Sequence, residues 1–216
     1  MSVFIPNTSG VYISTAISLA ATSDLTLLCW TYLSATTPAA YRDILSLDPN
    51  VFLQTGPTGL TFNCGTFAND HLGPAIAANT WYHMAYVCRS SSASAHQIRG
   101  YLNGQQVVDV ASDNSVFGAF TAVTVGNSTA QNTLPLNGLV RDVRVFTRAL
   151  TPTEVVREME SAIPVSESLF LWAPLDSDIV NDKSPYGRRF TATGAGILTL
   201  SGPLVAHSAR RRQSLR

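Results

Sequence analysis

Carboxylates, histidines and hydroxyls could give this sequence a catalytic site, but their spacing does not suit one. Hydrolysis of a glycosidic bond needs two facing carboxyl groups, which lie about 5 Å apart in retaining enzymes. The four glutamates lie in or just after a predicted helix, at positions 154, 158, 160 and 167, and no predicted strand carries two carboxylates two residues apart. The sequence also lacks a Gly-x-Ser-x-Gly motif for a nucleophilic serine. We therefore predict that the protein is not an enzyme.

Binding residues are easier to find, because polar and aromatic side chains occur in the predicted loops. Loops held by a rigid scaffold are where proteins usually place ligand contacts. Residues 67–73 form one such polar loop, for which a plain surface turn is the alternative interpretation. His83, by contrast, lies in an apolar run, and we interpret it as a hydrogen-bonded core residue. The predicted ligand-binding residues are Tyr41, Arg42, Asn69, Asp70, His71 and Asn127.

Most elements that would position these loops are β-strands, because the apolar residues alternate with a period of two. Asn103-Gly104, between two such segments, favours a tight type I′ hairpin. Trp30, Trp81 and Trp172 each lie within a strand, and we expect them to be core residues. The predicted strands cover residues 25–33, 44–47, 51–54, 60–64, 81–88, 98–102, 106–110, 120–125, 139–146, 169–172 and 197–200.

One short helix is predicted near residues 152–162. Thr151 supplies an N-cap hydroxyl, Pro152 suits the first helical position, and Glu154 completes a capping box. An apolar stripe follows at helical spacing, and Pro164 ends it. Many short strands with a single helix predict an all-β protein, folded as a two-sheet antiparallel jelly-roll sandwich.

Length and composition agree with one such domain. The chain has 216 residues, 13% of them charged, and no formal net charge. No apolar run approaches the ~18 residues of a membrane span. Residues 1–6 lack the basic and apolar regions of a signal peptide, so we expect synthesis in the cytoplasm without one. Cys29, Cys64 and Cys88 lie in separate apolar runs and are interpreted as small buried hydrophobic residues.

The charge is unevenly distributed along the chain. Residues 207–216 contain four arginines and no acid, so the rest of the chain carries about four more negative than positive charges. We predict one domain over residues 1–206 and a basic tail over residues 207–216. A protein contact is the favoured role of this tail, because one short cluster without aromatics is a weak nucleic-acid signal; a solvated terminus is the alternative. The predicted partner-binding residues are Arg210, Arg211, Arg212 and Arg216.

Five segments occur in an order that resembles the laminin-G-like, concanavalin A-like jelly roll. They are LTLLCWTY (25–32), NTWYHMAYV (79–87), YLNG (101–104), VTVGN (123–127) and LNGLVRDVRVFTRALT (136–151). The resemblance covers residues 11–160 and implies two stacked antiparallel sheets. It further implies a non-catalytic module that binds glycans or proteins through loops at one rim.

The resemblance also bears on metals and on the C-terminal strand. The resemblance suggests Ca²⁺ as a cofactor. Its ligands could come from two loops that meet at one rim, one with Asn69 and Asp70 and the other with Asp113 and Asn114. We predict no metal ligands and no cofactor, and a bound Ca²⁺ is the alternative. Arg141 stands where the family often has an acid, which argues against a metal there. Residues 169–176 resemble the segment that normally begins such a domain. We expect the strand at 168–174 to complete the sandwich within the chain, with donation to a neighbouring chain as the alternative.

Laminin-G-like modules of this compact, leaderless kind are similar to bacteriophage virion components. We therefore expect a structural or interaction module on a virion surface, as a decoration, head-associated or tail-associated protein. The expected partners are protein subunits of that assembly, including further copies of this chain, and glycans; no membrane or nucleic acid is expected. The first alternative is a lectin-like carbohydrate binder with Asp70, His71 and Asn127 at its site. A glycoside hydrolase is the third hypothesis.

Overall fold

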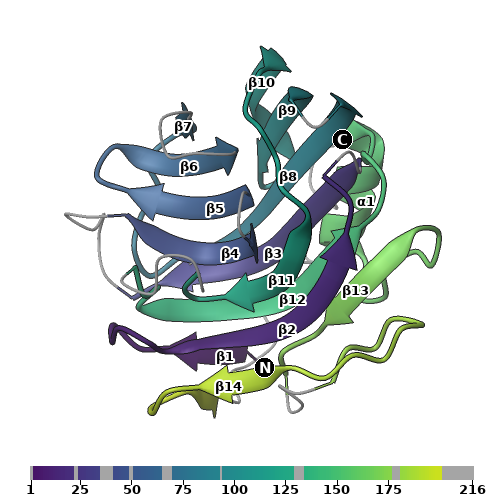
Figure 1. Cartoon of the computed structure of the whole chain (residues 1–216). Coiled ribbons are helices and arrows are strands. Elements are labelled where there is room, and N and C mark those ends of the chain that lie inside the picture. The colour runs from purple at the N-terminus through teal and green to yellow at the C-terminus, as the bar shows by residue number, and fades with distance from the viewer. Residues whose placement is uncertain are drawn as a thin grey trace, which may run out of the picture.

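The protein is a sandwich of two antiparallel sheets (Figure 1). The computed structural model describes residues 2–21, 24–34, 41–48, 51–64, 70–92, 94–128, 134–176 and 181–200. Its elements are β1 (Ser2–Ile5), β2 (Tyr12–Leu19), β3 (Leu25–Leu33), β4 (Arg42–Asp48), β5 (Val51–Gly56), β6 (Gly59–Cys64), β7 (Asp70–Leu72), β8 (Trp81–Ser92), β9 (Ala95–Leu102), β10 (Gln105–Asp113), β11 (Phe120–Val125), β12 (Gly138–Phe146), α1 (Pro152–Glu160), β13 (Leu169–Ala173), β14 (Thr191–Thr193) and β15 (Leu198–Leu200).

Strand order shows long-range pairing in both sheets. The first sheet has the order β10-β9-β8-β3-β12-β1-β15, and β13 also pairs with β12. The second sheet has the order β14-β2-β11-β4-β5-β6-β7. All these pairs are antiparallel, and neighbouring strands are often far apart in the sequence. The prediction of an all-β, two-sheet jelly-roll sandwich with one short helix is confirmed.

The core lies between the two sheets and follows the two-residue period of the strands. Leu25, Leu27 and Cys29 of β3 point into it, while the residues between them point outward. Gly100 of β9 lets the ring of Phe62, from the opposite sheet, pack against the backbone, since a Cβ there would lie 2.8 Å from that ring. Cys29 and Cys88 are free and buried, and burial raises the pKa of the Cys88 thiol to about 12. The side chain of Cys64 is outside the described part of the chain.

A bulge in β12 lets two strands share one of its edges. β1 pairs with Gly138–Val140, whereas β13 pairs with Val143–Phe146. The strand predicted at 168–174 is β13, and it therefore pairs within the chain. Between these two stretches Asp142 has a φ of 52°, which marks the bulge. The predicted tail, residues 207–216, lies outside the described residues, so the boundary at residue 206 stays a prediction.

Helix α1 covers part of the outer face of the first sheet (Figure 1). Its capping box forms as predicted: Thr151 Oγ1 accepts a hydrogen bond from the Glu154 amide, and the Glu154 carboxylate accepts one from the Thr151 amide. The helix ends at Glu160, two residues before the expected end. A second apolar cluster forms beneath it, consisting of Leu28, Ala85, Val87, Tyr101, Phe146, Leu150, Val155 and Leu169.

A buried ion cluster joins β12 to α1 and β13. Arg144, which is fully buried, donates to both carboxylate oxygens of Asp142 at 2.9 and 2.6 Å and to Glu158 Oε2 at 2.8 Å. It also donates to the carbonyl oxygens of Glu158 and Ser161. Trp172 Nε1 of β13 donates to Asp142 Oδ1 at 3.0 Å. This cluster therefore ties three elements together at the bulge.

The hairpin at Asn103-Gly104 has the predicted conformation, with φ angles of 50° and 78°. The described residues contain no helix that is long and apolar enough to cross a bilayer.

Candidate functional site

A row of polar side chains crosses the outer face of the second sheet. Strand register aligns Asp43 of β4 with Gln54 of β5, Gln54 with Thr61 of β6, and Thr61 with Leu72 of β7. Leu53 and Phe62, their neighbours in sequence, face the core, so the row faces away from it. Asp43, Gln54 and Thr61 are fully buried, whereas Leu72 is 54% exposed. We call Asp43, Gln54 and Thr61 the polar row; it reaches solvent at Leu72.

A β-bulge places Asp43 in this row. The register of β4 against β5 shifts between Asp43 and Leu45, and both Ile44 and Leu45 face the core. Beyond the bulge the ordinary alternation puts Ser46 and Asp48 on the outer face as well. Two carboxylates five residues apart therefore lie on the same face of one strand.

The polar row has hydrogen-bonding capacity that the described residues leave unused. Gln54 Nε2 donates to Asp43 Oδ1. Asp43 Oδ2, Gln54 Oε1 and Thr61 Oγ1 are buried and have no hydrogen-bond partner among the described residues. Buried polar atoms of this kind are rare in folded proteins and cost about 1–3 kcal/mol each. The row is therefore suited to a ligand that both donates and accepts hydrogen bonds.

Burial changes the charge that Asp43 carries near neutral pH. Loss of solvent raises the pKa of its carboxyl group, the hydrogen bond from Gln54 lowers it, the nearby charge of Asp48 raises it and a backbone hydrogen bond from Ser128 lowers it, and the resulting pKa is about 7. Asp48 itself accepts a hydrogen bond from Thr124 Oγ1 at 3.2 Å, and Thr124 also bonds Ser46. Asp43 can thus act as a donor or as an acceptor close to physiological pH.

The structure brings three predicted ligand-binding residues to one end of β4. The exposed Tyr41 ring lies over Gly56, beside the polar row. Arg42 Nη1 donates to Asn7 and to the carbonyl oxygen of Pro135. Asn127 is fully buried, and its Oδ1 accepts from the amides of Ser128 and Leu134. Arg42 and Asn127 therefore hold Leu134 and Pro135 in place, and of the three candidates only Tyr41 is exposed.

Asp70 and His71 lie three strands away, in β7. His71 Nε2 contacts Asp113 Oδ2 of β10 at 2.7 Å, which bridges the open edges of the two sheets. Asp70 pairs with Asn63 by register, but its side chain and all of Asn69 are outside the described residues. The candidates whose side chains are described therefore do not form one group. Arg210, Arg211, Arg212 and Arg216 also lie outside the described part of the chain.

Comparison with known families decides the relationship of the chain. Residues 6–156 match the laminin-G type of the concanavalin A-like lectin/glucanases superfamily. The chain belongs to this superfamily.

Solved structures share the concanavalin A-like fold at low sequence identity. A Bacteroides ovatus protein described as carbohydrate-binding superposes with a TM-score of 0.68 at 17% identity, over 95% of this chain and 61% of its own length. Domain 4 of the arabinanase AbnA from Geobacillus stearothermophilus, in complex with arabinotriose, gives 0.52 at 20%, over 73% and 75%. The Trypanosoma rangeli sialidase with sialic acid gives 0.52 at 16%, over 70% and 26%. No curated protein matches the chain.

The prediction that the three tryptophans of this concanavalin A-like domain are core residues is wrong. Trp30, Trp81 and Trp172 are only partly buried, because they lie on the outer face of the first sheet. The Arg141 guanidinium lies 5.3 Å from the Trp30 ring centre and 4.6 Å from that of Trp81. Arg141 is thus a stacking residue at the position where the superfamily often has an acid.

His83 is buried, but on the outer face of the first sheet opposite Trp30, so the prediction of a hydrogen-bonded core residue is wrong. Neither ring nitrogen has a partner in the described ranges, and the ring packs edge-on against Trp30. Burial and, to a smaller extent, the positive charge of Arg144 lower the pKa of His83 to about 3. His83 is therefore neutral at physiological pH and fills space beneath the tryptophan.

The residues expected to hold Ca²⁺ are engaged elsewhere where the structure describes them. Asp113 accepts hydrogen bonds from the Ser115 amide and from His71. Burial alone would raise the pKa of Asp113, but the hydrogen bonds from Ser115 and His71 outweigh it and lower the pKa. No cluster of three or more His, Cys, Asp or Glu side chains suited to a metal occurs within the described ranges. The described residues of this rim therefore do not fit a calcium site.

Sequence reasoning missed the polar row. Asp43 and Asp48 are five residues apart, so a regular strand would place them on opposite faces, and only the bulge at Leu45 puts them on one face. The alternation of Ser46 and Asp48 with Leu45 and Leu47 was the available signal, since it marks a strand with one polar face.

Proposed function

We propose that this domain is a non-catalytic carbohydrate-binding module, that the sugar lies against the exposed Tyr41 and Leu72 beside the polar row, and that a local opening of this face lets the sugar reach the buried row. The observation that carries the proposal is the set of unpaired polar atoms in that row, on Asp43, Gln54 and Thr61. Two structural neighbours, the Bacteroides ovatus protein and the arabinanase domain with arabinotriose, are described with carbohydrates and share the fold. At identities this low, the structural similarity supports the fold alone. The sugar-binding role is argued from the polar row.

Sugar hydroxyls match the groups that the row presents. Each hydroxyl donates one hydrogen bond and accepts others, so it can bond the acceptor oxygens of Asp43 and Gln54 as well as the hydroxyl of Thr61. Tyr41 and Leu72, which are 37% and 54% exposed, add apolar surface next to the row and at its end. The apolar face of a sugar ring packs against such side chains.

Several features support a binding role over hydrolysis. On their shared strand face Ser46 lies between Asp43 and Asp48, so the two carboxylates are not neighbours, as the pair of a retaining glycosidase must be. Each carboxylate also accepts a hydrogen bond from a neighbouring side chain, from Gln54 and Thr124 respectively. Turnover of any glycan that binds would overturn the non-catalytic part of the proposal.

Removing the hydrogen-bonding groups of the row is expected to weaken glycan binding without unfolding the domain. A glycan array identifies a ligand, and isothermal titration calorimetry then compares Gln54→Ala and Thr61→Ala with the unchanged protein. Loss of a hydrogen bond worth about 1 kcal/mol predicts a roughly fivefold lower affinity for each variant.

Thr191→Ala is the matched control for this titration. Thr191 is an exposed threonine of β14 in the same sheet, so its replacement should leave the affinity unchanged. Absence of binding to every glycan on the array, or equal affinity of all variants for the glycan, would contradict the proposal.

We further propose that the domain is mounted on a larger protein assembly, such as a phage-type virion surface, through its basic tail. The support is the concentration of four arginines in residues 207–216 against an acidic remainder. Replacing Arg210, Arg211, Arg212 and Arg216 with glutamine in the full chain is expected to convert an oligomer to a monomer, as measured by light scattering. A monomer before and after the change would contradict self-association.

A further inference from the structure

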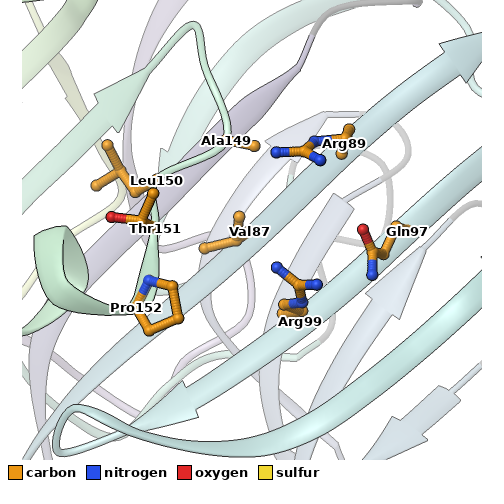
Figure 2. Close-up of a pocket in the computed structure, with 8 residues that line it drawn as sticks. All are labelled: Val87, Arg89, Gln97, Arg99, Ala149, Leu150, Thr151 and Pro152. Atoms are coloured by element: carbon orange, nitrogen blue, oxygen red, sulfur yellow. The ribbon is translucent and has the colours of Figure 1, made fainter.

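A small basic cavity lies on the outer face of the first sheet, beside the start of α1 (Figure 2). Its volume is about 60 Å³. Arg89 and Arg99 project over the strands β8 and β9 near Gln97 and Val87, and the segment from Ala149 to Pro152 forms the opposite wall. This face of the sandwich is opposite to the polar row, so the two sites are separate.

Strand register places the two guanidinium groups close together. Val87 pairs with Arg99 and Arg89 pairs with Gln97, so the arginines are diagonal neighbours on one face of the sheet. Such like charges repel each other unless an anion lies between or beside them. The lining of the cavity contains no acid. The arrangement therefore leaves an excess of positive charge at this point.

The nearby acids neutralise only part of this charge. Asp109 forms an ion pair with Arg99, with 3.6 Å between Asp109 Oδ2 and Arg99 Nε, and this Nε donates no hydrogen bond to a described residue. Arg89 forms no ion pair with any described residue. Glu154 is bound by both terminal nitrogens of Arg148, at 2.9 and 2.8 Å, and by Thr151.

The helix itself contributes little to the positive charge. Thr151 and Glu154 cap the first turn of α1, and Pro152 has no amide hydrogen to donate. The two arginines and the Gln97 amide are therefore the groups that a ligand would meet.

We infer that this cavity binds one oxyanion group, a sulfate, phosphate or carboxylate. Guanidinium groups pair with such oxygens through two parallel hydrogen bonds, and Gln97 can donate another. A cavity of about 60 Å³ has room for a single oxyanion group. Val87 and Leu150, both buried, give the cavity an apolar floor, where charge pairing is stronger than in water.

Titration of inorganic sulfate, and separately of phosphate, into the full chain tests the inference. One saturable site is expected, and the double variant Arg89→Gln/Arg99→Gln should weaken it by at least about tenfold. Arg157→Gln, a change at a half-exposed arginine of α1, should leave it unchanged. Circular dichroism confirms that each variant is folded. Absence of saturable binding to either anion, or equal binding by the double variant, would overturn the inference.

A second arm identifies the source of the oxyanion. A sulfated tetrasaccharide and its desulfated form are titrated into the same proteins. If the sulfated form binds more tightly than both inorganic sulfate and the desulfated form, and the double variant removes this gain, the anion belongs to an acidic glycan. If the sugar adds nothing, the site takes a free anion. Gln54→Ala should retain sulfate binding, so failure of the polar row and failure of this cavity are told apart.

Discussion

Replacing Arg144 with alanine is expected to lower the free energy of unfolding by about 3–5 kcal/mol. The change leaves the fully buried Glu158 carboxylate without its hydrogen-bonded cationic partner, with only the half-exposed Arg157 at 3.8 Å, and Asp142 loses both of its hydrogen bonds from the guanidinium. It also releases the carbonyl oxygens of Glu158 and Ser161 at the end of α1. Because β12, α1 and β13 meet at this cluster, we expect the substitution to destabilise all three elements. Urea denaturation followed by circular dichroism measures the free energy of unfolding.

Arg157→Ala is the matched control for this experiment. Arg157 is 52% exposed and lies 3.7 to 3.8 Å from two of the same helix's glutamates, so its removal should cost less than about 1 kcal/mol. Adding Glu158→Gln to Arg144→Ala should recover part of the lost stability, because the unpaired buried charge is removed. Similar stabilities for Arg144→Ala and Arg157→Ala would show that the buried cluster does not hold these elements together.

The second large effect expected is a pH dependence that comes from Asp43. The folded protein raises the pKa of this carboxyl group from 3.8 to about 7. Between those values the folded state holds a proton that the unfolded state has lost, so the free energy of unfolding falls as the pH rises, by at most about 1.4 kcal/mol per pH unit. Asp43→Asn cannot ionise. The difference in free energy of unfolding between this variant and the unchanged protein should therefore shift in favour of the variant by about 2–4 kcal/mol between pH 4 and pH 8.

The difference between the two proteins isolates Asp43 from other titrating groups. His83 has a depressed pKa, so its contribution to stability increases as the pH rises towards 6.5, in the opposite direction. That contribution is common to both proteins and cancels in the comparison. Asp109→Asn, at a 45% exposed position, is the control for removing one carboxyl group. Parallel stability curves for Asp43→Asn and the unchanged protein would refute the assignment.

Features that depend on local sequence were predicted correctly. Alternating apolar residues specified strands such as Leu25–Leu33, because one face of each strand must be buried. Thr151 and Glu154 specified the start of α1, since both partners of a capping box lie within three residues. Asn103-Gly104 specified its hairpin because both residues accept a positive φ angle.

Features that depend on which strands are neighbours could not be predicted from the same patterns. Gln54 and Thr61 join Asp43 only through the pairing of β4, β5 and β6, and His71 meets Asp113 only where two sheet edges approach. Arg99 and Arg89 are ten residues apart, and the β8–β9 register makes them neighbours.

The sequence by itself therefore determined the fold class, the helix and the alternation of buried and outward residues, since these follow from interactions between residues close in the chain. Only the tertiary structure decided the polar row, the buried Arg144 cluster and the basic cavity. The physical reason is that strand register, and a single bulged residue such as the one before Leu45, sets which outward side chains share a face.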